Sequence, residues 1–279
     1  MADSFAVRFA AVRTRFGPLT WGLDPSGALL ERWGLGDSPG GLDRFADLML
    51  EAAAGTVGLV KPQSAFYERH GWRGVRTLQR LVADARAAGL LVVLDVKRGD
   101  VGSTNAAYAE AYLGRGAPLE ADAVTVHPYL GLDAMEAFVT RAAEAGSCLL
   151  VVTRSSNPEG RAVQAAVSPG GQAVDAALLS RIGALNAALA PGEIGPVGAV
   201  IGAAPVEPPL DLRAASGLFL APGLGAQGAG PADLARTFAA CPDRVFPSAS
   251  RSLLAAGPDL GALRDAAAAL AGEVRAALS

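Results

Sequence analysis

The residues with the clearest chemical potential lie between Leu94 and Thr104, in the sequence Leu-Asp-Val-Lys-Arg-Gly-Asp-Val-Gly-Ser-Thr. Asp95 and Lys97 are two residues apart at the end of an apolar run, so on an extended strand their side chains share one face; Asp100 follows in the loop. Opposite charges in contact keep each other ionised, and a lysine between two carboxylates can act as a positioned general acid. The same spacing also suits a salt-bridged loop that connects a strand to its helix. From spacing alone, a catalytic and a structural role are about equally favoured.

A second candidate segment is rich in glycine. It contains the spacing G-x-G-x-x-G at Gly223, Gly225 and Gly228. A dinucleotide-binding fold would place this fingerprint in its opening unit, whereas here six apolar strand candidates come earlier in the chain. Glycines let backbone N–H groups approach an anion, and Gln227 and Arg251 could bind a phosphate beside them. The segment therefore predicts a phosphate site, with a flexible surface loop as the alternative.

The elements that must position these segments follow from the alternation of apolar runs and helical spacing. Nearly continuous runs of Leu, Val and Ile are typical of parallel strands covered on both faces. The expected strands are Leu19–Asp24, Val57–Lys61, Leu90–Lys97, Ala123–His127, Cys148–Thr153, Val197–Ala203, Gly217–Ala221 and Arg244–Pro247. The expected helices include Leu42–Ala54, Gly74–Ala88, Thr104–Leu113, Leu132–Ala145, Gln172–Leu189, Pro231–Ala240 and Leu260–Leu278.

Eight such strand–helix units in 279 residues predict a single-domain (β/α)₈ barrel over residues 1–279, with a doubly wound open sheet as the runner-up. A barrel places functional side chains at the carboxyl ends of its strands. The expected strand ends do carry polar groups: Asp24, Lys61, Lys97, His127, the Thr153–Asn157 segment, and Ser248 with Arg251. One such residue is ordinary, but charged ends on several strands favour a shared site at the barrel mouth.

The composition suits a large buried core and local charges. Apolar residues make up 51% of the chain, charged residues 18%, and the formal net charge is −3, so no global basic field favours nucleic acid. Cys148 and Cys241 make neither a disulfide framework nor a zinc site. The first 16 residues lack the apolar run of a signal peptide, and no stretch suits a bilayer span, so we expect a cytoplasmic protein.

Histidines and tryptophans offer weaker signals. His127 precedes a proline, and a lone histidine in such a place is more often a structural hydrogen-bonding group than a catalyst. The three tryptophans, Trp21, Trp33 and Trp72, are expected to pack in the core rather than to form a base-stacking platform.

Together these residues resemble the orotidine 5′-phosphate decarboxylase family, with the spacing of its longer bacterial subgroup, type 2. The segment Val92–Thr104 is similar to the family signature, an apolar strand followed by D-x-K-x-x-D-[IV]-x-x-T. Lys61 and the loop Pro-Gly-x-Gly-Ala-Gln narrow the resemblance further. Asp24, Thr153–Pro158 and Arg251 also occur in the family's order. Ser250 departs from it, because the family more often has glycine there.

The resemblance implies a barrel homodimer that converts orotidine 5′-monophosphate to UMP and carbon dioxide, the last step of de novo UMP (pyrimidine) synthesis, with no metal or organic cofactor. It implies that Lys97 protonates C6 and that Asp95 lies beside the departing carboxylate, with Lys61 and Asp100 completing the charged network. Decarboxylation leaves a carbanion that no ring carbonyl can directly delocalise, and a fixed ammonium group stabilises that charge better than reorienting water.

The resemblance also implies the substrate contacts. Asp24 and Lys61 would hold ribose hydroxyls, and Ser156, or else Ser155, would read the pyrimidine. Pro222, Gln227 and Arg251 would form the phosphate side of the site. Asp100 and Thr104 would reach into the site of the partner subunit.

Two other functions fit parts of the pattern. Sugar-phosphate decarboxylases of the same suprafamily share D-x-K-x-x-D but use magnesium and carry an acidic residue where Lys61 stands; a lysine there repels a divalent cation. The second alternative is a catalytically silent barrel that binds a phosphorylated ligand. Such a barrel would not need all four of the charged residues Lys61, Asp95, Lys97 and Asp100, and this sequence has all four.

Overall fold

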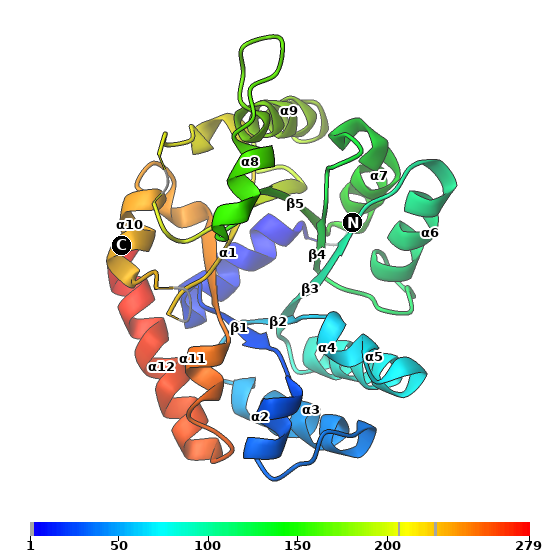
Figure 1. Ribbon diagram of the computed structural model, residues 1–279, viewed down its shortest axis with the longest axis vertical. Coiled ribbons are helices and arrows are strands. Elements are labelled where there is room, and N and C mark those ends of the chain that lie inside the picture. Colours follow the sequence, from blue (N-terminus) through cyan, green and yellow to red (C-terminus); the bar gives the residue numbers. More distant parts are fainter. Residues whose placement is uncertain (1–2, 206, 226–227) are drawn as a thin grey trace.

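The structure, a computed structural model, describes residues 3–205, 207–225 and 228–279. Eight parallel strands close into a barrel in sequence order, with helices around it (Figure 1). The strands are β1 (Thr20–Leu23), β2 (Leu59–Pro62), β3 (Leu91–Arg98), β4 (Ala123–Val126), β5 (Cys148–Arg154), β6 (Val197–Ile201), β7 (Phe219–Pro222) and β8 (Val245–Ala249). The predicted (β/α)₈ barrel is confirmed, and the open sheet is wrong because β1 pairs with β8 through Thr20–Ser248 and Trp21–Ala249.

The helices lie between and outside the strands. The α-helices are α1 (Phe5–Phe16), α2 (Gly27–Arg32), α3 (Pro39–Ala53), α4 (Ala65–Glu68), α5 (Gly71–Ala87), α6 (Gly102–Tyr112), α7 (Glu136–Ala145), α8 (Arg161–Gln164), α9 (Val174–Leu189), α10 (Pro231–Thr237), α11 (Arg251–Leu254) and α12 (Leu260–Ala277). Short 3₁₀ turns are η1 (Leu132–Met135), η2 (Pro158–Gly160), η3 (Leu212–Ala215) and η4 (Pro242–Arg244). In the described ranges, no helix has the length and apolar character needed to cross a membrane.

The hydrophobic core has two parts. One fills the space between the barrel wall and the surrounding helices, where α3 and α5 present their apolar faces. The other fills the barrel interior and includes Leu150, Leu220 and Phe246. Because the carboxyl ends of parallel strands all point the same way, these packed layers leave one open mouth for a site.

Helix α1 closes the opposite end of the barrel. Its Phe5 and Phe9, one helical turn apart, pack against Phe246 in the barrel interior, with ring centroids 5.9 and 5.4 Å from that ring. Arg8 on the same helix forms an ion pair with the buried Asp122 and donates to the carbonyl of Gly146 at 3.0 Å. The sequence analysis did not predict this helix, because its arginines interrupt the apolar spacing.

The tryptophan prediction is confirmed in part. Trp21 and Trp33 are buried in the core, as expected. Trp72 is not a core residue: it lies on α5 with 68% of its surface exposed, and the guanidinium of Arg73 lies 5.0 Å from its ring centroid. The cysteines pack as expected, and burial raises the pKa of Cys148 to about 12.

Candidate active site

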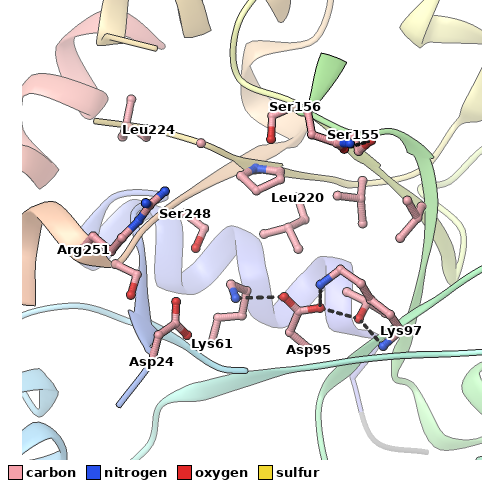
Figure 2. A pocket seen from close by; sticks show the side chains of 17 residues that line it. Asp24, Lys61, Asp95, Lys97, Ser155, Ser156, Leu220, Leu224, Ser248 and Arg251 are labelled. Atoms are coloured by element: carbon pink, nitrogen blue, oxygen red, sulfur yellow. Dashed lines mark hydrogen bonds and ion pairs between the residues drawn. The ribbon is translucent and has the colours of Figure 1, made fainter. Parts of the chain in front are cut away.

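A cavity of about 310 Å³ opens at the carboxyl ends of the strands (Figure 2). It brings together seven of the predicted site residues: Asp24, Lys61, Asp95, Lys97, Ser156, Pro222 and Arg251. They come from six of the eight strand ends, so the fold assembles the site from segments far apart in the sequence. Gln227 lies outside the described residues.

An array of alternating charges crosses the cavity. The carboxylate of Asp95 accepts from Lys61 Nζ at 3.0 Å through one oxygen and from Lys97 Nζ at 2.5 Å through the other. Asp95 and Lys61 are 5% and 6% exposed, whereas the side chain of Lys97 is 37% exposed. Lys97 therefore presents an ammonium group to the cavity while its counter-ion stays buried.

The electrostatics keep the array ionised. Burial alone would raise the pKa of Asp95, but the ammonium groups of Lys61 and Lys97 and a hydrogen bond from Thr125 hold it well below its usual range. Burial would likewise lower the pKa of Lys61, but the carboxylates of Asp95 and Asp24 outweigh burial and raise it. At neutral pH the cavity therefore contains a buried ion pair with a second cation beside it.

Asp24 follows β1 and lines the cavity on the side of Lys61 (Figure 2). Its Oδ1 is buried and has no hydrogen-bond partner among the described residues. A buried carboxylate oxygen without a partner is costly, so this atom is suited to accept from a ligand hydroxyl.

Arg251 lies on the far side of the cavity from Lys97, near Ser248 (Figure 2). It begins α11 directly after β8. Pro222, which pairs with Ser248 between β7 and β8, and Gly223 line the same cavity. Gly223 adopts a φ of 103°, a left-handed backbone conformation that favours glycine and brings the loop after β7 close to the cavity. This end of the cavity has the basic and backbone groups that suit an anion.

Ser250 is accommodated here by a glycine on the neighbouring strand. A Cβ at Gly22 in β1 would lie 2.5 Å from the Cβ of Ser250, a distance that real side chains do not reach. Ser250 Oγ is buried without a partner among the described residues, and the residue lines the cavity. The larger residue before Arg251 thus fits because Gly22 leaves room for it.

The two serines after β5 differ in their surroundings. The hydroxyl of Ser155 donates to Asn157 Oδ1 at 2.6 Å and accepts from Gln164 Nε2 at 2.8 Å. The backbone and Cβ of Ser156 pack over Gly202, where an added Cβ would lie 3.1 Å from the Ser156 Cα. Both serines line the cavity (Figure 2).

Asp100 and Thr104 lie outside this cavity, in the described part of the chain that follows β3. Asn105, which is fully buried, holds the loop: its Oδ1 accepts from the Asp100 N–H at 3.0 Å, and its Nδ2 donates to the carbonyls of Asp100 and Ala134. Thr104 is exposed on α6. A single chain therefore fixes Asp100 firmly without placing it among its own cavity residues.

One polar residue of the array was not expected from the sequence. Thr125 in β4 is fully buried, lines the cavity and donates to Asp95 Oδ1 at 2.8 Å. Its only signal was a hydroxyl in the otherwise apolar run Ala-Val-Thr-Val. His127, two residues on, is exposed, and its backbone N–H donates to the Arg98 carbonyl at 2.8 Å. Although the residue reaches the surface, partial desolvation of its ring and the Lys97 ammonium lower the pKa of His127.

Lys61 and Lys97 are also the only lysines of the chain. Every other basic side chain in the Lys+Arg count of 24 is an arginine. Lysine is a compact point charge whose protonation responds to its surroundings, whereas arginine stays charged. The chain thus uses lysine solely in the cavity.

A closed parallel barrel with a charged cavity at the carboxyl ends of its strands defines a (β/α)₈-barrel enzyme. Residues 18–266 match the model of the orotidine 5′-phosphate decarboxylase / HUMPS family. The chain belongs to this family and is a carboxy-lyase.

Individual relatives agree along the whole chain. An orotidine 5′-phosphate decarboxylase of Salinispora arenicola is 50% identical and one of Streptomyces coelicolor 48% identical, each over 99% of both chains. A crystal structure described as that enzyme from Streptomyces avermitilis is 48% identical, with a TM-score of 0.93 over 99% of this chain and 96% of the other.

Proposed function

We propose that this chain, acting as one domain in the cytoplasm, converts orotidine 5′-monophosphate to UMP and carbon dioxide in the last step of de novo UMP synthesis, with no metal ion or organic cofactor. The observation that carries the proposal is the array of Lys61, Asp95 and Lys97, with Arg251 across the cavity. Lys97 and Arg251 lie on opposite sides of the cavity (Figure 2), an arrangement that suits a substrate with a carboxylate at one end and a phosphate at the other.

In the proposed step, the bond between C6 and the carboxylate carbon breaks and its electron pair stays on C6. The ammonium of Lys97 delivers a proton to C6 as carbon dioxide leaves, and the resulting amine later takes a proton from water. A fixed ammonium stabilises the developing charge without the reorganisation that water would need. Asp95 lies beside the departing carboxylate and holds Lys97 in place.

The remaining cavity residues bind the substrate. Asp24 Oδ1, which has no partner among the described residues, accepts from a ribose hydroxyl, and the neighbouring Lys61 donates to the ribose. Ser156, which lines the cavity after β5, reads the pyrimidine.

The phosphate binds at the other end of the cavity. Arg251 is the cationic group there, and Pro222 shapes the wall beside it. Gln227 from the same glycine-rich loop completes the phosphate site in this proposal. Binding energy from the phosphate, which is remote from C6, can be used to orient the reacting end.

The protein acts as a homodimer in which Asp100 and Thr104 complete the site of the partner subunit. Both residues lie outside the cavity of their own chain: Asp100 is in a loop held by the buried Asn105, and Thr104 is in the first turn of α6. Val101, next to Asp100, is 53% exposed, and Tyr129, two residues after the His127 whose backbone N–H bonds the Arg98 carbonyl, is 83% exposed. Exposed apolar side chains next to a rigid polar loop are typical of an interface.

The deciding experiment follows the loss of orotidine 5′-monophosphate absorbance with purified protein in the presence of a chelator. We expect turnover that the chelator does not change. Absence of decay at any practical enzyme concentration would refute the proposal. Magnesium-dependent activity on a keto-sugar phosphate would instead indicate the metal-dependent branch of the suprafamily. Binding of UMP without turnover of orotidine 5′-monophosphate would indicate a catalytically silent binding barrel.

A further inference from the structure

The pairing of β3 with β4 is irregular at the point where the charged array begins. Leu94 pairs with Val124 and Arg98 with Val126, so three residues of β3, among them Asp95 and Lys97, face Thr125 alone. Bulges of this kind re-aim side chains and occur next to active sites. The extra length of β3 is what turns Lys97 toward the cavity.

Lys97 has an unusual backbone conformation within this bulge. Its φ is 44°, in the left-handed region that residues other than glycine rarely adopt. Such a conformation persists only when the surrounding structure holds it in place. The backbone N–H of Lys97 donates to Thr125 Oγ1 at 3.0 Å.

The same hydroxyl reaches the second member of the array. Thr125 Oγ1 donates to Asp95 Oδ1 at 2.8 Å, the oxygen that also accepts from the Lys97 ammonium. Thr125 is fully buried, so water does not compete for either bond. One hydroxyl thus fixes the backbone of Lys97 and the carboxylate that holds the Lys97 side chain.

We propose that Thr125 is a positioning residue for the decarboxylation, a role that rests on the function proposed above. It bridges the Lys97 backbone to the Asp95 carboxylate and thereby sets where the Lys97 ammonium lies. Proton delivery to C6 depends on that position, whereas the phosphate and ribose contacts at Arg251 and Asp24 do not.

The test replaces the hydroxyl by a methyl group of similar volume in Thr125→Val and retains it in Thr125→Ser. Hydrogen bonds to charged groups are among the stronger ones, so we expect kcat to fall roughly 10- to 100-fold in Thr125→Val. KM and the inhibition constant of UMP should change less than about 3-fold, and Thr125→Ser should restore most of kcat.

A matched control is Thr20→Val. Thr20 is also fully buried in a barrel strand, but its hydroxyl has no partner among the described residues, and it is not part of the cavity lining. We expect this variant to keep the kcat of the parent protein. A loss equal to that of Thr125→Val would show that any buried threonine in the barrel wall has the same effect, and would overturn the proposal.

A second measurement does not depend on turnover. In protein labelled with ¹³C-lysine, the spectrum contains the ε-methylene signals of Lys61 and Lys97 alone. Thr125→Val should move the Lys97 signal and leave that of Lys61 nearly unchanged. Unchanged signals together with unchanged kcat would refute the positioning role. An inactive parent protein would refute the proposed function, and the Lys97 signal would still decide whether Thr125 positions that residue.

Discussion

Replacing Lys97 by alanine is the most informative single perturbation of the site. The change removes the ammonium that the cavity presents to a ligand but leaves Asp95 with two partners, Lys61 at 3.0 Å and Thr125 at 2.8 Å. The buried carboxylate therefore stays paired, and the barrel should fold as before. The chemistry, by contrast, loses its proton donor and its nearest positive charge.

The magnitude follows from these two losses. A unit charge about 4 Å from the developing carbanion contributes about 4 kcal/mol at the effective dielectric constant of a protein site, which corresponds to roughly 10³-fold in rate. General acid catalysis contributes a further 10²- to 10⁴-fold, roughly. We expect kcat to fall roughly 10⁵-fold or more in Lys97→Ala.

Stability should change far less than turnover. The Lys97 side chain is 37% exposed, so solvent weakens its ion pair with Asp95, and the free energy of unfolding should fall by about 1 kcal/mol. In a chain of this size that is a decrease in Tm of only a few degrees. UMP affinity should stay within about 10-fold, because the phosphate and ribose contacts remain.

The assay combines orotidine 5′-monophosphate decay, thermal unfolding and UMP binding. Arg98→Ala is the matched control, because it also removes a cation from β3. The side chain of Arg98 bonds to Glu68 and Tyr112 and does not line the cavity. The kcat of Arg98→Ala should stay within about 3-fold of the parent. A Lys97→Ala protein that folds, binds UMP and keeps more than about 1% of kcat would show that another group donates the proton.

Three further predictions follow. A mixed dimer of Lys97→Ala and Asp100→Ala chains should regain one working site, measured as activity on mixing two inactive proteins; no recovery from heterodimers shown to form would place each site within one chain. Gly22→Ala should raise KM at least 10-fold with a smaller change in kcat, because the new Cβ would lie 2.5 Å from the Ser250 Cβ and displace the segment before the phosphate-binding arginine; an unchanged KM would contradict this. The pKa of Asp95 is lower in the folded than in the unfolded protein, so its ionisation stabilises the fold fully above the unfolded pKa of about 3.9, and this stability is lost as pH falls toward the folded pKa. The free energy of urea unfolding should therefore depend less on pH below about 4 in Asp95→Asn than in the parent. Parallel pH dependences of the two proteins would contradict this prediction.

Local patterns predicted the barrel well because its strands are short, apolar and buried on both faces. The expected strand Leu90–Lys97 differs from the observed β3 by one residue at each end, and Cys148–Thr153 differs from β5 by one residue at its end alone. Strand ends depend on pairing with neighbours, which explains the larger shift from Gly217–Ala221 to Phe219–Pro222 in β7. Helix α1 escaped prediction because only Phe5 and Phe9 are buried and its arginines interrupt the apolar spacing.

The site was predicted as far as charge and strand position allow. Asp95 and Lys97 were expected to share a face, and they do meet, but through a bulge and a left-handed residue that no spacing rule specifies. The role of Thr125 could not be predicted for the same reason, because it depends on the irregular pairing of β3 opposite this residue of β4. The engagement of Ser155 with Gln164 likewise depends on how the chain after β5 folds back, which sequence alone does not show.

Because both lysines lie in the cavity, reagents that react with amines should modify this protein selectively at that site. Amine-directed reagents, which modify most proteins over their whole surface, would find here only the N-terminal amine, the half-exposed Lys97 and the shielded Lys61. Acylation should therefore act as an active-site label, and a bound ligand should protect against it. The decrease in labelling that a ligand causes, read by intact mass, then reports the fraction of sites that it occupies.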